Sequence, residues 1–119
     1  MQHRPKISVI IVNYNGERWL NDSIESVVNQ THADFECLII DNGSTDGSIK
    51  KLPKLDNRFE IIKLGNNTGF AYANNFAVSK SRGDWIALLN PDAFAAPDWL
   101  KKLYEATKVF SGITMVGST

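Results

Sequence analysis

Short apolar runs alternate along this chain with segments whose apolar positions recur every three or four residues. The first run, residues 7–12, is largely β-branched and apolar, which is typical of a strand covered on both faces. The pattern predicts strands at 7–12, 35–40, 59–64, 85–89 and 113–116, and helices at 17–30, 44–51, 70–81 and 97–110. This alternation predicts an α/β fold with a mainly parallel sheet and helices on both faces.

The helical segments also have predicted boundaries and buried faces. Asn15 is expected to cap the first helix, and the helix at 44–51 should stop before Pro53. The inward faces are expected to consist of Trp19, Leu20, Ile24, Val27 and Val28 in the first helix, and of Ala71, Ala73, Phe76 and Ala77 in the third.

Three of the predicted strands end in polar residues followed by turn-forming residues. Asn13 and Tyr14 follow the first run, Asp41 follows the second, and Asp92 follows the fourth. The carboxyl ends of parallel strands lie along one edge of the sheet, where ligands bind in open α/β folds. We therefore expect Tyr14, Asp41 and Asp92 to lie near one another, and this edge to hold a ligand.

Length and composition narrow the classes of protein to consider. The 119 residues fit one domain, and 13 basic residues balance 13 acidic ones, which argues against nucleic acid as a partner. Cys37 is the only cysteine, inside a predicted strand, and is expected to be a buried structural thiol. No apolar run near the start has the length of a signal peptide core or a membrane span, so we expect a cytoplasmic protein; peripheral attachment to a membrane through another part stays open.

The end of the sequence suggests an incomplete domain. The last predicted strand has only begun when the chain stops at Thr119. We expect a truncated form whose uncovered sheet self-associates.

Two familiar phosphate-binding loops are missing from the sequence. No G-x-G-x-x-G follows the first strand, where the residues are 13–17, Asn-Tyr-Asn-Gly-Glu. The glycine pairs at 43 and 47 and at 65 and 69 lack the Lys-Ser/Thr that completes a P-loop. Dinucleotide-dependent oxidoreductases and P-loop NTPases are therefore disfavoured.

Four ordered segments instead resemble family 2 glycosyltransferases. They are Ser8-Val-Ile-Ile-Val-Asn-Tyr-Asn-Gly16 with Leu20, Ile24-Glu-Ser26 and Gln30; Ile39-Ile-Asp-Asn-Gly-Ser-Thr-Asp46; Asn66-Asn-Thr-Gly-Phe-Ala71 with Asn74; and Leu89-Asn-Pro-Asp92. The last two look most like the rhamnosyltransferase-type branch. The resemblance covers nearly the whole chain, and it rests on the order and spacing of the four segments.

This resemblance implies the GT-A fold and a nucleotide-diphosphate sugar donor, with residues 1–119 as the donor-binding part and the acceptor-binding half absent. The full enzyme would transfer a sugar from a dTDP or UDP donor to a glycan or lipid-linked acceptor with inversion, and the likeness to the rhamnosyltransferase-type branch points to rhamnose as that sugar. Tyr14 would stack on the base, and Asp41 would accept a base N–H. The nucleotide-binding positions would be Val12, Tyr14, Asn15, Asp41 and Asn90.

The resemblance also implies a divalent metal, Mn²⁺ or Mg²⁺, held by Asp92 as the closing acid of a D-x-D-like motif. Here the first acid of that motif is Asn90, which removes one charge. Ala73 stands where many members of the family have an arginine, so a diphosphate contact is missing or supplied elsewhere. Lys80 and Arg82 are candidates for that contact only by proximity, and we expect them to be solvated charges at a helix end.

No residue of this chain fits the general base that inverting transfer requires. In the family that base lies well downstream of the D-x-D-like motif, and Asp98 suits the start of a helix better. Asp46 and Asp84 are expected to be turn or cap residues. Two alternatives stay open. One is a non-catalytic nucleotide-binding module of the same fold. The other is a flavodoxin-like signalling domain, which is less favoured because it needs an acidic cluster after the first strand and residues 13–15 contain none.

Overall fold

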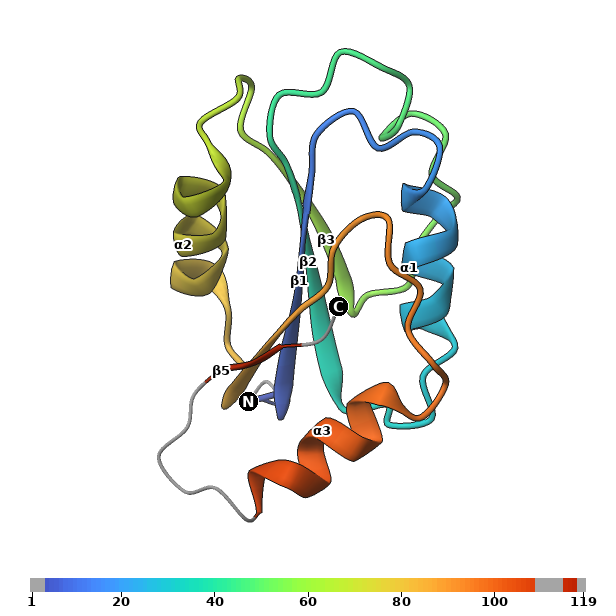
Figure 1. Ribbon diagram of the computed structural model, residues 1–119, viewed down its shortest axis with the longest axis vertical. Coiled ribbons are helices and arrows are strands. Elements are labelled where there is room, and N and C mark those ends of the chain that lie inside the picture. The colour runs from blue at the N-terminus through green and yellow to red at the C-terminus, as the bar shows by residue number, and fades with distance from the viewer. Residues whose placement is uncertain (1–3, 109–114, 118–119) are drawn as a thin grey trace.

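A computed structural model describes residues 4–108 and 115–117 of the chain. The elements are β1 (Ile7–Asn13), α1 (Leu20–Val28), β2 (Phe35–Asp41), β3 (Phe59–Lys63), α2 (Phe70–Lys80), β4 (Trp85–Leu88), α3 (Trp99–Thr107) and β5 (Met115–Gly117). Within the described residues they form one sheet with helices packed against it (Figure 1). No helix in this part of the chain is long and apolar enough to cross a membrane.

The described strands form a five-stranded sheet in the order β3-β2-β1-β4-β5, and every pairing is parallel. β1 is central: Ile7 pairs with Phe35 of β2 on one side and with Trp85 of β4 on the other. The predicted α/β fold with a mainly parallel sheet is confirmed.

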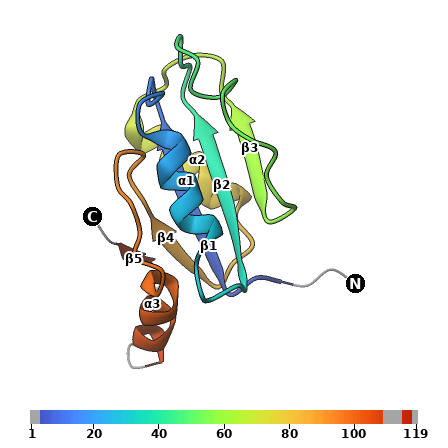
Figure 2. The ribbon, with the colours of Figure 1, turned by 90° about the vertical axis from the view of Figure 1, so that its right-hand side faces the viewer.

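Alternate residues of the strands face two separate apolar layers. Val9 and Ile11 of β1 pack on the side of α1 and α3, whereas Ile10 and Val12 pack on the side of α2. Figures 1 and 2 show α1 and α2 on opposite faces of the sheet, as the sequence predicted. Cys37 is fully buried in the first layer, and this burial raises the pKa of its thiol far above the ordinary value, which fits a structural role.

The predicted helix at 44–51 is wrong, because this segment forms loop and a single turn at 48–51. Ser44 and Ser48 donate their hydroxyls to the Asp41 and Asp46 carboxylates, and Asp46 also accepts the Ser48 N–H. Such local bonds compete with helix formation. The loop continues to β3 and covers the α1 side of the sheet with Ile49, Leu52 and Leu55.

The first helix is shorter than predicted, running from Leu20 to Val28 after a turn at 17–19. The cap assignment of Asn15 is wrong: no side chain caps this helix, and Gly16 C=O accepts the N–H groups of Trp19 and Leu20. Trp19 and Val28, predicted to be buried, are 41% and 36% exposed. Trp19 lies in the turn before the helix and Val28 is its last residue, so both are at the ends of the apolar stripe.

In α2 the buried residues are Ala73 and Ala77, with Phe76 partly buried against the same layer. Ala71, predicted to face inward, is exposed. It lies in the first turn of the helix, near the loop that leads in from β3. The third helix, α3, begins at Trp99 rather than 97, and the predicted residues 109 and 110 lie outside the described part.

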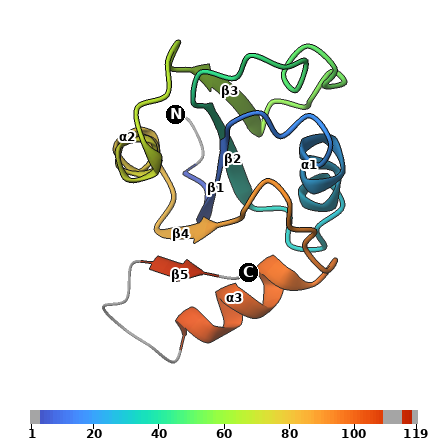
Figure 3. The same ribbon diagram turned by 45° about the horizontal axis from the view of Figure 1, so that its top comes forward.

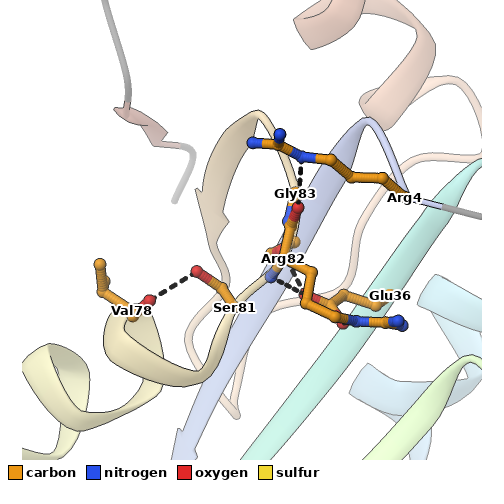
Figure 4. Close-up of polar contacts among 7 residues, drawn as sticks. Arg4, Glu36, Val78, Ser81, Arg82 and Gly83 are labelled. Atoms are coloured by element: carbon orange, nitrogen blue, oxygen red, sulfur yellow. Dashed lines mark hydrogen bonds and ion pairs between the residues drawn. The ribbon is translucent and has the colours of Figure 1, made fainter.

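The amino ends of the strands are joined by a buried carboxylate, Glu36 of β2 (Figure 4). Glu36 accepts hydrogen bonds from Ser8 Oγ at 2.6 Å, from the Arg82 backbone N–H at 2.6 Å and from Arg82 Nε at 3.2 Å. Arg4 donates to the Arg82 carbonyl and pairs with Asp84 at 2.9 Å. Arg82 therefore lies at the edge of the sheet opposite to the carboxyl ends of the strands, which removes it as a diphosphate contact.

Candidate functional site

The strand order reverses between β1 and β4, and such a reversal opens a crevice at the carboxyl edge of the sheet. The loop after β1 and the turn after β4 meet there: a Cβ built on Gly16 would lie 3.7 Å from Cβ of Pro91. Figure 3 views the sheet with this edge turned forward. The segments that carry Tyr14 and Asp92 are therefore brought together although they are far apart in sequence.

Asn13, the last residue of β1, is fully buried and links the loops after β1 and β2. Its Nδ2 lies 3.1 Å from Asp41 Oδ1, 3.2 Å from Ser44 Oγ and 3.0 Å from Ser48 Oγ. Both serine hydroxyls donate onward, Ser44 to Asp41 and Ser48 to Asp46, so their oxygens are free to accept from Asn13. The two loops form one hydrogen-bonded unit below the edge of the sheet.

Asn15 holds the same two loops together on the exposed side. Its Oδ1 accepts the backbone N–H groups of Thr45 at 2.8 Å and Asp46 at 3.2 Å, and its own N–H donates to Ser44 Oγ at 2.9 Å. Its φ angle of 53° lies in the left-handed region, which asparagine tolerates better than most residues. Tyr14 lies between Asn13 and Asn15 and presents a side chain that is 48% exposed.

Replacing Asn15 with alanine is expected to lower the free energy of unfolding by about 1–2 kcal/mol, because two backbone N–H groups lose their acceptor and a left-handed residue loses its adaptable side chain. Asn15→Gly is the matched control, since glycine adopts this φ freely but supplies no acceptor. The glycine variant should lose less stability than the alanine variant. Urea unfolding followed by tryptophan fluorescence measures both, and equal stability of Asn15→Ala and the parent would contradict the proposed link.

Asp41 ends β2 and is only 6% exposed. Its Oδ1 accepts from Ser44 Oγ at 2.6 Å and from Asn13 Nδ2 at 3.1 Å, and its Oδ2 accepts the Ser44 N–H at 3.3 Å. A carboxylate has about four acceptor positions, so Oδ2 keeps capacity for one further donor. The neighbouring Asn13 and Ser44 thus fix the orientation of the carboxylate.

Asn42 ties the end of β2 to the loop that leads into α2. It is buried, and its Oδ1 accepts both the N–H and the hydroxyl of Thr68, at 2.9 and 2.8 Å. Its Nδ2 donates to Asn67 Oδ1 and to the Gly69 carbonyl, each at 3.3 Å. A Cβ on Gly43 would come within 2.5 Å of the Asn66 backbone, so the 41–48 and 65–69 loops are also in close contact.

Asp92 lies in a turn after β4 that is closed by a 3.0 Å hydrogen bond from the Ala93 N–H to the Asn90 carbonyl. The side chains of Asn90 and Asp92 are both exposed. Within the described residues, neither side chain has a hydrogen bond or ion pair, which leaves two oxygen donors, two residues apart, available to a ligand. Asp98, by contrast, pairs with Lys102 at 3.2 Å.

Val12 contributes to this edge through its backbone, because its side chain packs in the layer under α2. The β1–β4 ladder ends with the Leu89 N–H bonded to the Ile10 carbonyl at 3.0 Å. Two residues further on, the same register would place Pro91 opposite the Val12 carbonyl, and proline has no N–H to donate. The ladder therefore stops at the point where the crevice opens.

Asp46 is a loop acceptor, as expected from the sequence. It accepts from the backbone N–H groups of Glu17 and Ser48, each at 3.0 Å, and from Ser48 Oγ. Partial burial alone would raise the pKa of Asp46, but the hydrogen bonds from Ser48 and Glu17 outweigh it and hold the pKa below the ordinary value. Asp84 is likewise engaged at the other edge of the sheet, with Arg4.

A cavity of about 450 Å³ lies between α1 and the loop before β3, away from these residues. Its lining consists of Asn21, Ile24, Glu25, Val28, Pro53, Lys54, Leu55 and Asp56. The polar groups at the sheet edge therefore lie apart from this cavity. Among the described residues, no group of three or more His, Cys, Asp or Glu is placed to hold a metal ion.

The structure brings Val12, Tyr14, Asn15 and Asp41 together at the ends of β1 and β2. The approach of Pro91 to Gly16 places the turn with Asn90 and Asp92 next to the same loop. Sequence reasoning missed Asn13 and Asn42 as organising residues. The available signal was that each is an asparagine directly at the end of an apolar strand, where a buried amide must find partners.

The chain matches the sequence model of Glycosyl transferase family 2 over residues 8–113. It is 34% identical over 105 residues to the putative teichuronic acid biosynthesis glycosyltransferase TuaG of Bacillus subtilis, covering 86% of this chain and 42% of that protein. It is also 34% identical over 121 residues to an uncharacterized glycosyltransferase of Haemophilus influenzae, covering 99% of this chain and 38% of that protein. The chain thus spans about two fifths of the length of these relatives.

Two solved structures share the fold. S. aureus TarS 1–349 in complex with UDP-GlcNAc superposes with a TM-score of 0.79 at 24% identity, covering 87% of this chain and 31% of that one. The mannosyltransferase PcManGT of Pyrobaculum calidifontis, in complex with GDP-Man and Mn²⁺, gives 0.79 at 21% identity, covering 88% and 33%. Fold, edge geometry and sequence agree, and the chain belongs to glycosyl transferase family 2.

Proposed function

We propose that this chain is the donor-binding part of an inverting glycosyltransferase that uses a nucleotide-diphosphate sugar. The observation that carries the proposal is the reversal of strand order between β1 and β4, which places the Tyr14 loop against the turn that holds Asp92. Complexes of structural neighbours with UDP-GlcNAc and with GDP-Man support a donor of this class.

The roles follow from the geometry of each group. The exposed ring of Tyr14 would stack on the base, and the remaining acceptor position on Asp41 Oδ2 would take an N–H of the base. The Val12 backbone would line the floor of the crevice. Asn15 would act by fixing the loop that carries Tyr14, and Asn90 would face the nucleotide across the crevice.

The oxygen donors at the 90–92 turn suit a hard divalent cation such as Mn²⁺ or Mg²⁺. One carboxylate and one amide are too few ligands by themselves, so the donor diphosphate would have to complete the coordination. Such a cation would offset the negative charge that develops on the departing diphosphate. Asp92 would hold it, and we expect metal binding to depend on the nucleotide.

The finer parts of the proposal rest on other grounds. Rhamnose as the sugar, with a dTDP or UDP donor, is proposed from the likeness of segments 66–71 and 89–92 to that branch of the family. A glycan or lipid-linked acceptor of the cell envelope is supported by the relative named for teichuronic acid biosynthesis. The general base would lie in a further part of the protein. A cytoplasmic location, peripheral to a membrane, and self-association of this chain stay predictions.

Calorimetric titration of UDP, dTDP and GDP, each with and without Mn²⁺, tests the proposed function. We expect binding that requires the metal and is lost on adding EDTA, and the three affinities would rank the bases. AMP, with a single phosphate, is the control and should bind much more weakly. Absence of nucleotide diphosphate binding, in this chain and in a version extended to the length of its relatives, would reject the proposal.

A non-catalytic nucleotide-binding module is the second candidate, favoured by the neutral Asn90 at the position of the first acid. It predicts nucleotide binding without turnover. Slow hydrolysis of a donor sugar by the extended protein, abolished with Asp92→Ala, would exclude it.

A further inference from the structure

The segment between β4 and α3, which contains Asp92, is held in place by polar side chains of α1 and of the residues just after it. We propose that Ser26 and Gln30 are positioning residues: they fix the segment that follows the 90–92 turn and so set where Asp92 meets the metal and the donor. This inference rests on the proposed function and adds to it two residues that touch neither ligand.

Gln30 lies just beyond α1 and is only 7% exposed. Its Nε2 donates to the Ala96 carbonyl at 2.7 Å and to the Ser26 carbonyl at 3.0 Å, and its Oε1 accepts the Leu100 N–H at 2.9 Å. One amide side chain thus joins the end of α1, the loop after the turn and the first turn of α3. The Leu100 N–H lies in the first turn of α3, where it has no backbone acceptor, so its bond to Gln30 is not redundant. The Ala96 carbonyl also accepts the Trp99 N–H at 3.0 Å, so Gln30 adds a second donor there.

Ser26 lies one helical turn before Gln30 and binds the same segment. Its Oγ accepts the Ala95 N–H at 3.0 Å and donates to the Ser23 carbonyl at 2.6 Å. Ser23 Oγ in turn reaches the Asn90 carbonyl at 3.4 Å, a weaker contact on the other side of Asp92. The hydroxyl of Ser26 is therefore used as acceptor and donor at once.

These contacts leave the 90–92 turn little freedom. Residues 95, 96 and 100 are fixed by α1 on the C-terminal side, while the close approach of Gly16 to Pro91 limits the turn from the β1 loop. Asp92 lies between these supports with an exposed carboxylate. Its position relative to Tyr14 is thus determined by residues more than sixty positions earlier in the chain.

Matched variants separate hydrogen bonding from shape. Ser26→Val and Ser26→Thr have the same β-branched outline and differ only in the hydroxyl. Gln30→Met keeps the length of the side chain and removes both polar atoms. Asn29→Ala changes an exposed neighbour and serves as the surface control.

The first measurement needs no ligand: amide hydrogen exchange, read at Ala93. The Ala93 N–H closes the 90–92 turn and touches neither substituted side chain. We expect it to exchange about tenfold faster in Ser26→Val and Gln30→Met, since loss of one or two hydrogen bonds corresponds to about that factor. Ser26→Thr, Asn29→Ala and the core amides of β1 and β2 should stay within about twofold of the parent.

The second measurement is the dissociation constant for Mn²⁺ in the presence of UDP or GDP. The Asp92→Ala variant gives the residual affinity that remains without the proposed metal ligand. We expect Ser26→Val and Gln30→Met to bind Mn²⁺ about tenfold more weakly, the low end of the loss seen when groups that orient a metal ligand are removed. Ser26→Thr should bind like the parent.

The two measurements distinguish the possible failures. Unchanged exchange at Ala93 in both variants overturns the positioning role, whatever the ligand results. Faster exchange with Mn²⁺ affinity equal to the parent overturns its relevance to binding. If the parent binds neither metal nor nucleotide, the proposed function fails, and exchange at Ala93 still decides whether Ser26 and Gln30 fix the turn.

Discussion

Asp92→Asn should weaken Mn²⁺-dependent nucleotide binding by about a hundredfold, because the turn at 90–92 would then present two neutral amides to a hard dication. Asparagine has nearly the shape of aspartate, and the turn is closed by backbone atoms, so the fold should be unaffected. Calorimetry with UDP or GDP at fixed Mn²⁺ measures the loss, and thermal unfolding checks that stability is unchanged.

Asp98→Asn is the matched control for this experiment. It makes the same chemical change six residues later, at a carboxylate that is already paired with Lys102. It should leave nucleotide affinity within about twofold of the parent, since an exposed ion pair contributes little. Equal losses in the two variants would show that general charge, rather than a site at Asp92, governs binding.

Glu36→Ala should lower the free energy of unfolding by about 2–3 kcal/mol. The substitution leaves the hydroxyl of Ser8 and the backbone N–H of Arg82 without their acceptor in a buried place. Breaking a fully buried ion pair costs about 3–5 kcal/mol. The Arg82 side chain is 53% exposed and can be solvated, so the loss expected here is the smaller value of about 2–3 kcal/mol. Urea or thermal unfolding gives the value.

Two further variants sharpen the Glu36 result. Glu36→Gln keeps the shape and one acceptor, so it should lose only about half as much stability. Glu60→Ala, on the exposed face of edge strand β3, should change stability by less than about 0.5 kcal/mol. Nucleotide affinity of folded Glu36→Ala should equal that of the parent, and a lower affinity would contradict the separation of this cluster from the candidate site.

Much of the fold follows from local patterns in the sequence. The strands at Ile7–Asn13 and Phe35–Asp41 were predictable because β-branched apolar runs covered on both faces leave few other structures available. The gathering of Tyr14, Asp41 and Asp92 at one edge followed from parallel pairing alone. The order of the strands did not, because it depends on which strands pair, and nothing in the run at 85–89 indicates that it lies beside β1.

The segments that sequence reasoning misjudged are those controlled by contacts between distant residues. The segment 44–51 was predicted to be a helix, but Ser, Thr, Asp and Gly at 44–48 are poor helix formers, and Asn13 and Asn15 bind its serines and backbone in a non-helical form. Asn15 was expected to cap the helix after it, and instead it accepts from Thr45 and Asp46. In both cases one of the partners lies about thirty residues away, beyond any local window.

The buried Glu36 cluster has a consequence for how proteins with this architecture diversify. It strengthens the amino edge of the sheet, while the loops at the carboxyl edge are joined mainly by side-chain hydrogen bonds at the surface of the core. Exposed side chains of those loops that lie outside these bonds, such as Tyr14, can therefore change without endangering the scaffold. Such positions are free to vary on one side of the sheet while the Glu36 cluster on the other side preserves the fold.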